Sequence, residues 1–499
     1  MKSLRIVIVG SGLGGLAAGI RLVSEGYQVT ILEKNALPGG CLRTKEINGF
    51  RFNYGAEIIT APFLFDQLFE LAGKNRRDYF DLLPFEPVFQ AIFPDKKRFA
   101  FFSDPKKMLQ WNNLFSQEDE RALFSYFQTS GQIFNKVFYD YCLKPIQEKT
   151  FQSFVPSFSK KLQTQKSSLQ IAEAYFTTPE LQNLFGFWPL LAGGNPKDSG
   201  FLFDMIPSIL YHWGASIPVG GMKRVLDALL SVFRELGGDI LYNSEVQEIQ
   251  VFNRTASGVR LVDGSIRHAD IVISDVDALS TFRFLIDSDK SNYASVTQAK
   301  EKIPGASVFT YHLGLSCPLE EKISLAGYNV IFPENLDVFL SDLFHRKTLS
   351  ADPFFILKIP SKTDVYASPH GCEALSVVIP VPNLSGDILW ERESYIFRTH
   401  LLELLQDYFI TDLRKNILIE DFTDPLRMWT ENGSYLGAAF SMMPGSAKKP
   451  LHRFPNRCKD IHNLYLVGAG SHPGPSIPGV LMGAANAVSQ IKAEALRTI

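Results

Sequence analysis

The chain has few cysteines and almost no net charge, and both features exclude certain classes of protein. The five cysteines are odd in number, widely scattered and form no CxxC pair. They indicate neither a disulfide framework nor a zinc site and fit a reducing compartment, so we expect a cytoplasmic protein. A formal net charge of −2 lacks the basic surplus of a nucleic-acid-binding protein. The nine histidines include no HExxH motif, so we expect no metal site.

Long uncharged hydrophobic runs are also missing. No stretch approaches about twenty apolar residues without a charge, so the sequence predicts no membrane-spanning helix. The 499 residues, of which 45% are hydrophobic and 20% charged, are typical of a globular protein and too many for one ordinary domain. We therefore expect at least two domains with a large buried core.

What the sequence does contain is a glycine motif at its start, IVIVGSGLGGLAAGIRLVSEGYQVTILEK, from Ile6 to Lys34. A β-branched strand over 6–9, the GxGxxG glycines, a helix ending near Gly26, a strand over 28–32 and Glu33 follow in order. This order is that of a dinucleotide-binding unit rather than a signal peptide, because its glycines let a pyrophosphate approach the helix N-terminus. To the adenosine and phosphate side of the site we assign Gly10, Gly12, Gly14, Gly15, Glu33 and Lys34.

A second glycine cluster, PGGCLRT, begins five residues after Glu33. Its glycine pair, Gly39 and Gly40, and the cation of Arg43 suit the far side of a long dinucleotide. A simple NAD domain would proceed directly to its next helix, so the cluster favours FAD, although a plain turn is the alternative for the glycines.

The same nucleotide domain resumes in the middle of the chain. The stretch from Pro218 to Val251 predicts a helix with one buried face and then a strand, with Val246 placed to contact an adenine ring. The following GVRLVDGSIRHADIVIS predicts a hairpin and a buried strand over 271–273, with a ligand-free β-meander as the alternative.

The C-terminus supplies the last piece, NLYLVGAGSHPGPSIPGVLMGAANAVSQIKAEAL. It predicts a buried strand over 464–467 and a closing helix whose N-terminal dipole would stabilise the anion of a reduced flavin ring. GPSIPG departs from a hydrolase nucleophile elbow because Pro478 takes the place of its second glycine. To the flavin side we assign Gly468, Gly470, Pro478, Gly479 and Val480.

These pieces predict an α/β fold with two domains. A Rossmann-like FAD-binding domain is assembled from the discontinuous segments 1–75, 216–280 and 455–499. An α+β domain for substrate binding and membrane docking comprises 76–215 and 281–454, in an amine-oxidase-like arrangement.

Phenylalanine is concentrated in the second domain. Of 40 phenylalanines, fifteen lie between Phe80 and Phe158, which predicts a long apolar cavity. The segment from Ile92 to Trp111 interleaves lysines with aromatic residues, as at a lipid interface. The alternative is that these phenylalanines pack a core or line the cavity.

Four stretches resemble the bacterial and fungal carotenoid desaturases, the phytoene and dehydrosqualene desaturase group of flavoprotein oxidoreductases. They are VIVGSGLGGLAAGIRL with ILEKNALPGG; LLAGGNPKDSGFLFDMIPSILYHWGASIPVGGM; HGCEALSVVIPVPNL; and AAFSMMPG followed by NLYLVGAGSHPGPSIPGV. The resemblance covers nearly the full length.

The resemblance implies an FAD enzyme, peripheral on the inner face of a membrane, that takes hydride from a lipophilic polyene precursor such as phytoene or dehydrosqualene. Quinone or oxygen would regenerate the flavin. The chain departs from the family pattern at Asn53, Ala56, Ser471 and Ser476, near the expected ring and substrate. Substrate and reaction type therefore stay open, since relatives also oxygenate, isomerise or saturate carotenoids.

Two other interpretations compete with this one. A prenyl-lipid carrier on the same scaffold would not need the intact glycine motifs. A flavin amine or porphyrinogen oxidase would need an aromatic cage or a flavin-linking cysteine, and Cys458 lacks that context. For a general base the candidates are Asp140 and His472, with a solvated helix acid and a packed histidine as the alternatives.

Overall fold

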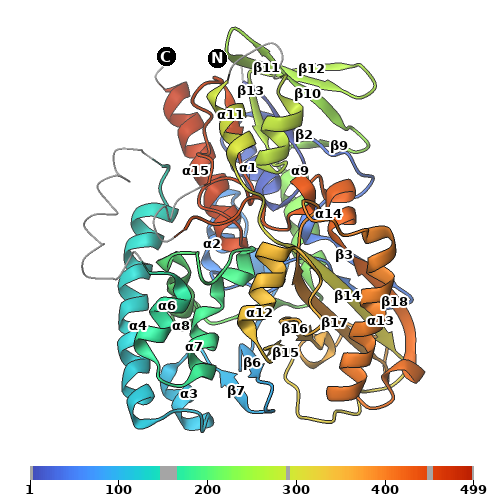
Figure 1. The fold of residues 1–499 in the computed structure, drawn as a ribbon. Helices are drawn as coiled ribbons and strands as arrows, with labels where there is room; N and C mark the ends of the chain where they lie inside the picture. The colour runs from blue at the N-terminus through green and yellow to red at the C-terminus, as the bar shows by residue number, and fades with distance from the viewer. Residues whose placement is uncertain (1–3, 147–165, 288–292, 447–452, 497–499) are drawn as a thin grey trace.

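The computed structural model describes residues 4–146, 166–287, 293–446 and 453–496. Two bodies lie one above the other in Figure 1, and both chain ends lie at the top of the upper body.

A five-stranded parallel sheet forms the centre of the upper body, in the order β19-β13-β1-β2-β9. Its strands are β1 (Arg5–Val9), β2 (Gln28–Leu32), β9 (Asp239–Leu241), β13 (Ile271–Ser274) and β19 (Leu464–Leu466). They are short apolar runs because a parallel sheet is covered on both faces. All five come from the three segments assigned to the FAD-binding domain, and the sheet confirms the α/β class; the domain limits themselves remain a prediction.

Helices cover one face of this sheet and a small antiparallel sheet covers the other. Ile6 and Ile8 share a core with the three helices α1 (Leu13–Ser24), α9 (Met222–Glu235) and α15 (Ile477–Ala495). Val7 and Val9 point to the opposite face, where they join the core of the small sheet. That sheet consists of β10 (Val246–Phe252), β11 (Thr255–Leu261) and β12 (Ile266–His268), with α10 (Ala278–Ser280) and α11 (Ala294–Glu301) beside it.

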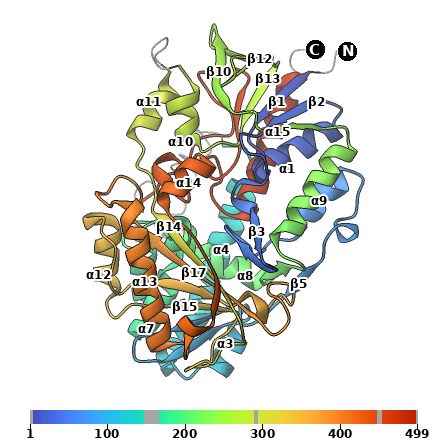
Figure 2. The same cartoon turned by 90° about the vertical axis from the view of Figure 1, so that its right-hand side faces the viewer.

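A seven-stranded mixed sheet dominates the lower body, in the order β18-β14-β17-β16-β15-β6-β7. Its strands are β6 (Phe89–Ile92), β7 (Arg98–Phe101), β14 (Ser307–Leu315), β15 (Tyr328–Ile331), β16 (Phe355–Lys358), β17 (Glu373–Val381) and β18 (Ile417–Thr423). Helix α13 (Trp390–Tyr408) packs on one face through Phe397, Leu401 and Leu405. In Figure 2 the hairpin strand β3 (Thr44–Ile47) lies between this sheet and the upper body.

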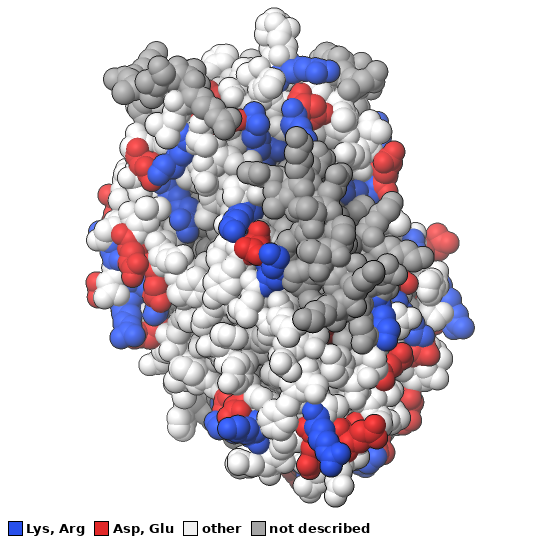
Figure 3. Space-filling view, turned by 90° about the vertical axis from the view of Figure 1, so that its left-hand side faces the viewer, with Lys and Arg blue, Asp and Glu red and all other residues white. Residues whose placement is uncertain are grey.

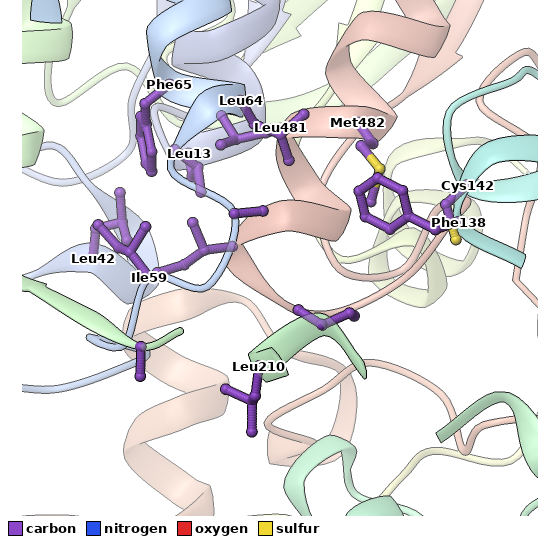
Figure 4. Close-up of a cluster of buried hydrophobic side chains, with 14 of the residues drawn as sticks. Leu13, Leu42, Ile59, Leu64, Phe65, Phe138, Cys142, Leu210, Leu481 and Met482 are labelled. Atoms are coloured by element: carbon purple, nitrogen blue, oxygen red, sulfur yellow. The ribbon is translucent and has the colours of Figure 1, made fainter. Parts of the chain in front are cut away.

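Helices build the remaining side of the lower body. They are α3 (Pro105–Trp111), α4 (Gln117–Val137), α6 (Ser168–Tyr175), α7 (Pro179–Gly186), α8 (Ile206–Trp213) and α12 (Leu336–Ser341). The elements between the two bodies are α2 (Phe63–Leu71), α14 (Pro425–Asn432) and the two-stranded pairs β3 (Thr44–Ile47) with β4 (Phe50–Asn53) and β5 (Leu82–Pro84) with β8 (Ser216–Pro218). Figure 4 shows how Leu13, Leu64 and Leu481 bring α1, α2 and α15 together in one apolar cluster.

The aromatic segment expected at a lipid interface is mainly a buried hairpin. Strands β6 and β7 pair Phe89 with Phe101, and Phe99, Phe101 and Phe102 are all buried. Alternation along β7 turns Phe99 and Phe101 inward while Arg98 stays exposed. Trp111 is the large apolar side chain that this segment exposes, at 71%. Three residues of the predicted phenylalanine-rich region lie outside the described residues: Phe151, Phe154 and Phe158.

The helical side of the lower body contains a buried acid. Asp204 accepts hydrogen bonds from the Tyr126 hydroxyl of α4 at 3.1 Å and from the Ser168 hydroxyl of α6 at 3.2 Å. Burial raises the pKa of Asp204 to about 8. A carboxyl whose pKa is raised by folding stabilises the fold at low pH, and this contribution is lost as the pH rises toward the folded pKa.

We therefore predict that Asp204→Asn reduces the loss of stability between pH 5 and pH 8. The wild type should lose up to about 1.4 kcal/mol of unfolding free energy per pH unit through this group, and the variant should not. Urea unfolding at several pH values measures the difference, and the other titrating groups, which both proteins retain, contribute equally to the two profiles. Parallel pH profiles for the two proteins would contradict the prediction.

Candidate functional site

One large cavity, of about 1050 Å³, connects the two bodies. This volume is at the upper end of the range of about 300–1,000 Å³ for ligand pockets. The glycine-rich turn before α1 lines the upper part, and the seven-stranded sheet together with α8 lines the lower part. The cavity therefore extends from the region with the dinucleotide motif to the region rich in phenylalanine.

The turn between β1 and α1 presents bare backbone to the cavity. Gly10 has φ +97°, which favours glycine, and a Cβ on Gly14 would lie 2.8 Å from the backbone nitrogen of Gly468. A Cβ on Gly12 would lie 2.6 Å from Oδ2 of Asp275. The helix N-terminus thus lies close to the ends of β13 and β19, with the Asp275 carboxyl against its glycines, and its positive end favours an anion at this edge of the cavity.

Glu33 stands at the end of β2, with 5% of its surface exposed, and lines the cavity. Its Oε2 accepts from the backbone nitrogen and the hydroxyl of Ser11, at 3.1 and 2.6 Å, and its Oε1 accepts from the nitrogen of Asn35 at 2.9 Å. The next residue, Lys34, donates to the carbonyl of Thr430 at 2.9 Å and so ties the loop to α14. These bonds hold the carboxylate at the cavity wall.

The N-terminus of α15 faces the same cavity. The Ser476 hydroxyl accepts from the nitrogen of Gly479 at 3.0 Å, which caps the helix. A Cβ on Gly470 would lie 2.7 Å from Cβ of Ala278 and 2.8 Å from the Ser441 hydroxyl, so only glycine fits there. Two helix N-termini, of α1 and α15, therefore point to one cavity, because both helices follow parallel strands of one sheet.

Most of the residues assigned to the cofactor from the sequence line this cavity. They are Gly10, Gly12, Gly14, Glu33, Lys34, Gly39, Gly40, Val246, Gly468, Gly470, Pro478, Gly479 and Val480. Gly15 lies behind the turn, where a Cβ would meet the Gly10 carbonyl. Arg43 instead pairs with Glu431 at 3.0 Å and donates to Asn432 at 2.9 Å, so its side chain holds α14 in place.

Neither candidate for the general base lines the cavity. Asp140 pairs with Lys136 at 2.6 Å and Lys144 at 3.1 Å, and these hydrogen bonds lower its pKa. His472 is fully buried, with Nε2 3.0 Å from the carbonyl oxygens of Tyr141 and Lys144, and burial lowers its pKa to about 4. The structure places both side chains where they stabilise the chain around residues 136–144.

Asp275 is a site residue that the sequence analysis missed. It follows β13, lines the cavity, and accepts hydrogen bonds from the backbone nitrogens of Gly12 and Gly15. Burial, and next the charge of Glu33, raise its pKa to about 7. An acid directly after a buried parallel strand was the available signal, because the carboxyl ends of neighbouring strands meet at one sheet edge.

These residues fit FAD. The bare backbone at Gly12 and Gly14 suits the pyrophosphate, Glu33 the adenosine ribose, and the N-terminus of α15 the electron-rich part of the ring. Asp275 lies against these glycines with its pKa raised to about 7, and two negative phosphates bound there would favour its neutral form.

We predict that FAD affinity falls as the pH rises through 7. If the neutral acid is the binding form, the dissociation constant should increase about tenfold from pH 6 to pH 8, following the protonated fraction of a group with pKa near 7. Asp275→Asn should bind FAD equally well at both pH values. Titration of apoprotein with FAD, followed by flavin fluorescence, measures this.

Asp263→Asn provides the matched control, because Asp263 is an acid on the exposed tip of the β11–β12 turn. It should keep the pH dependence of the wild type. An unchanged pH dependence in Asp275→Asn would assign the effect to another group.

The chain is similar to known proteins over nearly its full length. The chain is 30% identical over 483 residues to a lycopene-forming phytoene desaturase of Pseudescherichia vulneris, an alignment that covers 96% of this chain and 97% of the relative. It is 28% identical over 497 residues to a 4,4'-diaponeurosporene oxygenase of Staphylococcus aureus, with 98% of both chains covered. These relatives confirm the resemblance to the carotenoid desaturases.

The cyclohexylamine oxidase of Brevibacterium oxydans has the same fold, with a TM-score of 0.63, 15% identity and 99% of both chains covered. The model of the flavin-containing amine oxidoreductases matches residues 13–492, nearly the whole chain. With the FAD-compatible cavity between its two bodies, the chain therefore belongs to the flavin-containing amine oxidoreductase family and is an FAD-dependent oxidoreductase.

Proposed function

We propose that the protein desaturates a lipophilic polyene precursor of the phytoene or dehydrosqualene type. The observation that carries this proposal is the continuity of the cavity from the FAD region to a wall of aromatic and aliphatic side chains. That wall includes Phe89, Phe138, Phe187, Trp188, Phe203, Ile209, Leu210, Val330 and Phe354. The cavity's volume and its apolar lining suit a long hydrocarbon chain.

Desaturation of a CH2–CH2 unit removes a hydride and a proton, and bound FAD would take up both. The chain's own residues position the substrate and exclude water. Phe187 and Trp188 are 1% exposed and stack on each other with ring centroids 4.7 Å apart, which gives the wall a rigid surface. The positive ends of the α1 and α15 dipoles would stabilise negative charge at the cofactor end of the cavity.

The primary test is expression in a host that accumulates phytoene or dehydrosqualene. Wild-type protein should produce pigments that absorb at longer wavelengths, and the spectrum counts the added double bonds. Gly14→Ala should abolish pigment and bound FAD, because its Cβ would contact Asp275 and the backbone of Gly468. The matched control, Gly131→Ala in α4, should keep both, because its nearest neighbour is 3.8 Å away.

A colourless precursor in cells whose purified protein holds reducible FAD would overturn the substrate assignment. It would leave the family and the cofactor untouched.

We further propose that the protein docks on a membrane surface through the side formed by α4 and α8. None of the described helices is long and apolar enough to cross a membrane. Residues 122–135 of α4 contain no charged side chain, and Phe124 and Tyr211 are 45% and 54% exposed. Figure 3 shows a broad area without charge on this side, with charged residues around its lower margin. Exposed apolar surface of this kind supports binding to lipid.

The cavity lies directly behind this side. Helix α8 lines the cavity with Ile209 and Leu210 and exposes Tyr211 on the outside. A substrate dissolved in the bilayer would therefore need to pass only one short helix.

We predict that Phe124→Asp with Tyr211→Asp lowers binding to anionic liposomes at least about tenfold, because two aromatic side chains no longer enter the lipid. Flotation through a density gradient measures the bound fraction. Phe252→Asp, which changes a phenylalanine that is 74% exposed on β10, is the control and should float like the wild type. Wild-type protein that stays at the bottom of the gradient would contradict docking.

A further inference from the structure

The sheet wall of the cavity changes from apolar to polar between two neighbouring rows of residues. In one row Val330 pairs with Ile356, and Ile356 pairs with Val378. Two residues further along β15 and β16, Tyr328 pairs with Lys358. All five side chains line the cavity. The wall therefore offers an apolar length that ends at a phenol and an ammonium.

The polar row continues beyond the cavity into the sheet. Lys358 pairs with Ser376 and Ser376 with His312, and the Ser376 hydroxyl lies 2.8 Å from Nδ1 of His312. Burial, and next the positive charge of Lys358, lower the pKa of His312 to about 3. The imidazole is thus neutral, and Lys358 is the cation of this row.

A buried acid pairs with this cation. Oε1 of Glu57 lies 2.9 Å from Nζ of Lys358, and the two residues are 8% and 7% exposed. Asn53 donates to Oε2 of Glu57 at 2.7 Å and accepts from the Thr44 hydroxyl at 2.7 Å. This chain of bonds fixes the carboxylate at the cavity wall.

The ion pair leaves hydrogen-bonding capacity toward the cavity. An ammonium has three N–H donors, and Glu57 is the partner that the described part of the chain gives to Lys358. Buried ion pairs are costly to desolvate and are often no more stable than an apolar replacement, so packing alone does not explain this pair. A pure hydrocarbon lying here would leave the remaining donors unsatisfied, whereas an oxygen atom would accept from them.

We propose that Lys358 and Glu57 form a subsite for the terminal oxygen of an oxygenated polyene, a primary alcohol or an aldehyde. Lys358 donates to the oxygen, and Glu57 accepts from the hydroxyl of the alcohol. The inference rests on the proposed function, because the same cavity would hold the hydrocarbon part of the polyene; the subsite adds a preference for chains whose end carries an oxygen atom. The apolar row beside Ile356 contacts the hydrocarbon part of the chain.

The test compares three ligands of equal chain length with the FAD-loaded protein: a linear polyene hydrocarbon, its terminal alcohol and its terminal aldehyde, each in detergent micelles. Quenching of tryptophan fluorescence measures binding, because Trp188 and Trp429 line the cavity. Wild-type protein should bind the alcohol and the aldehyde at least about tenfold more tightly than the hydrocarbon, the value of one hydrogen bond to a charged group.

The double variant Lys358→Met with Glu57→Gln removes both charges and keeps similar volumes. It should bind all three ligands alike and retain its FAD. The matched control, Lys362→Met with Glu321→Gln, makes the same two changes in an ion pair outside the cavity and should keep the preference.

Equal affinity of the wild type for the three ligands would overturn the subsite and leave the proposed function standing, and this comparison needs no variant. A preference that persists in the double variant would also overturn it. Absence of binding by all three ligands would overturn both the subsite and the polyene substrate.

Discussion

The close approach of α1 to the ends of β13 and β19 is the constraint on which the site depends. At Gly14 the helix comes so near the backbone of Gly468 that a single added carbon would lie 2.8 Å from its nitrogen. Because these elements lie so close together, the positive end of α1 and the acid of Asp275 share one small volume. Helix α15 follows β19 in the same way that α1 follows β1, so its N-terminus opens at the same sheet edge.

The β3–β4 hairpin connects this region of the site to the seven-stranded sheet. Phe50 packs on Gly314 of β14, where an added Cβ would lie 2.9 Å from its ring. The ring of Phe52 lies tilted against that of His312, with ring centroids 5.0 Å apart. The chain then continues directly into Asn53 and Glu57, which line the cavity. One continuous segment therefore connects the glycine cluster at the cofactor end with the polar row of the substrate wall.

Local signals explain why much of the fold could be predicted from the sequence. The strands over 6–9 and 28–32 and the glycines between them depend on contacts within a few dozen residues, and the structure places them as expected. The segment from Ile92 to Trp111 predicted a lipid interface, but most of it is a buried hairpin. Alternating basic and aromatic residues are typical of both a lipid interface and a hairpin with one buried face. The partners of Arg43 and His472, and the pairing of Glu57 with Lys358, join distant parts of the chain. Such pairs follow from sheet register and domain packing, which periodicity does not encode.

The order of strands in the upper sheet also bears on how the protein matures. Strand β1 leaves the ribosome first, its neighbour β13 only after more than half of the chain has been made, and β19 near the very end. Pairings so distant in sequence form slowly and leave an apolar strand edge exposed during synthesis. The nascent polypeptide therefore cannot acquire its flavin until translation is nearly complete, and chains truncated before residue 464 would present chaperones and proteases with an unfinished sheet.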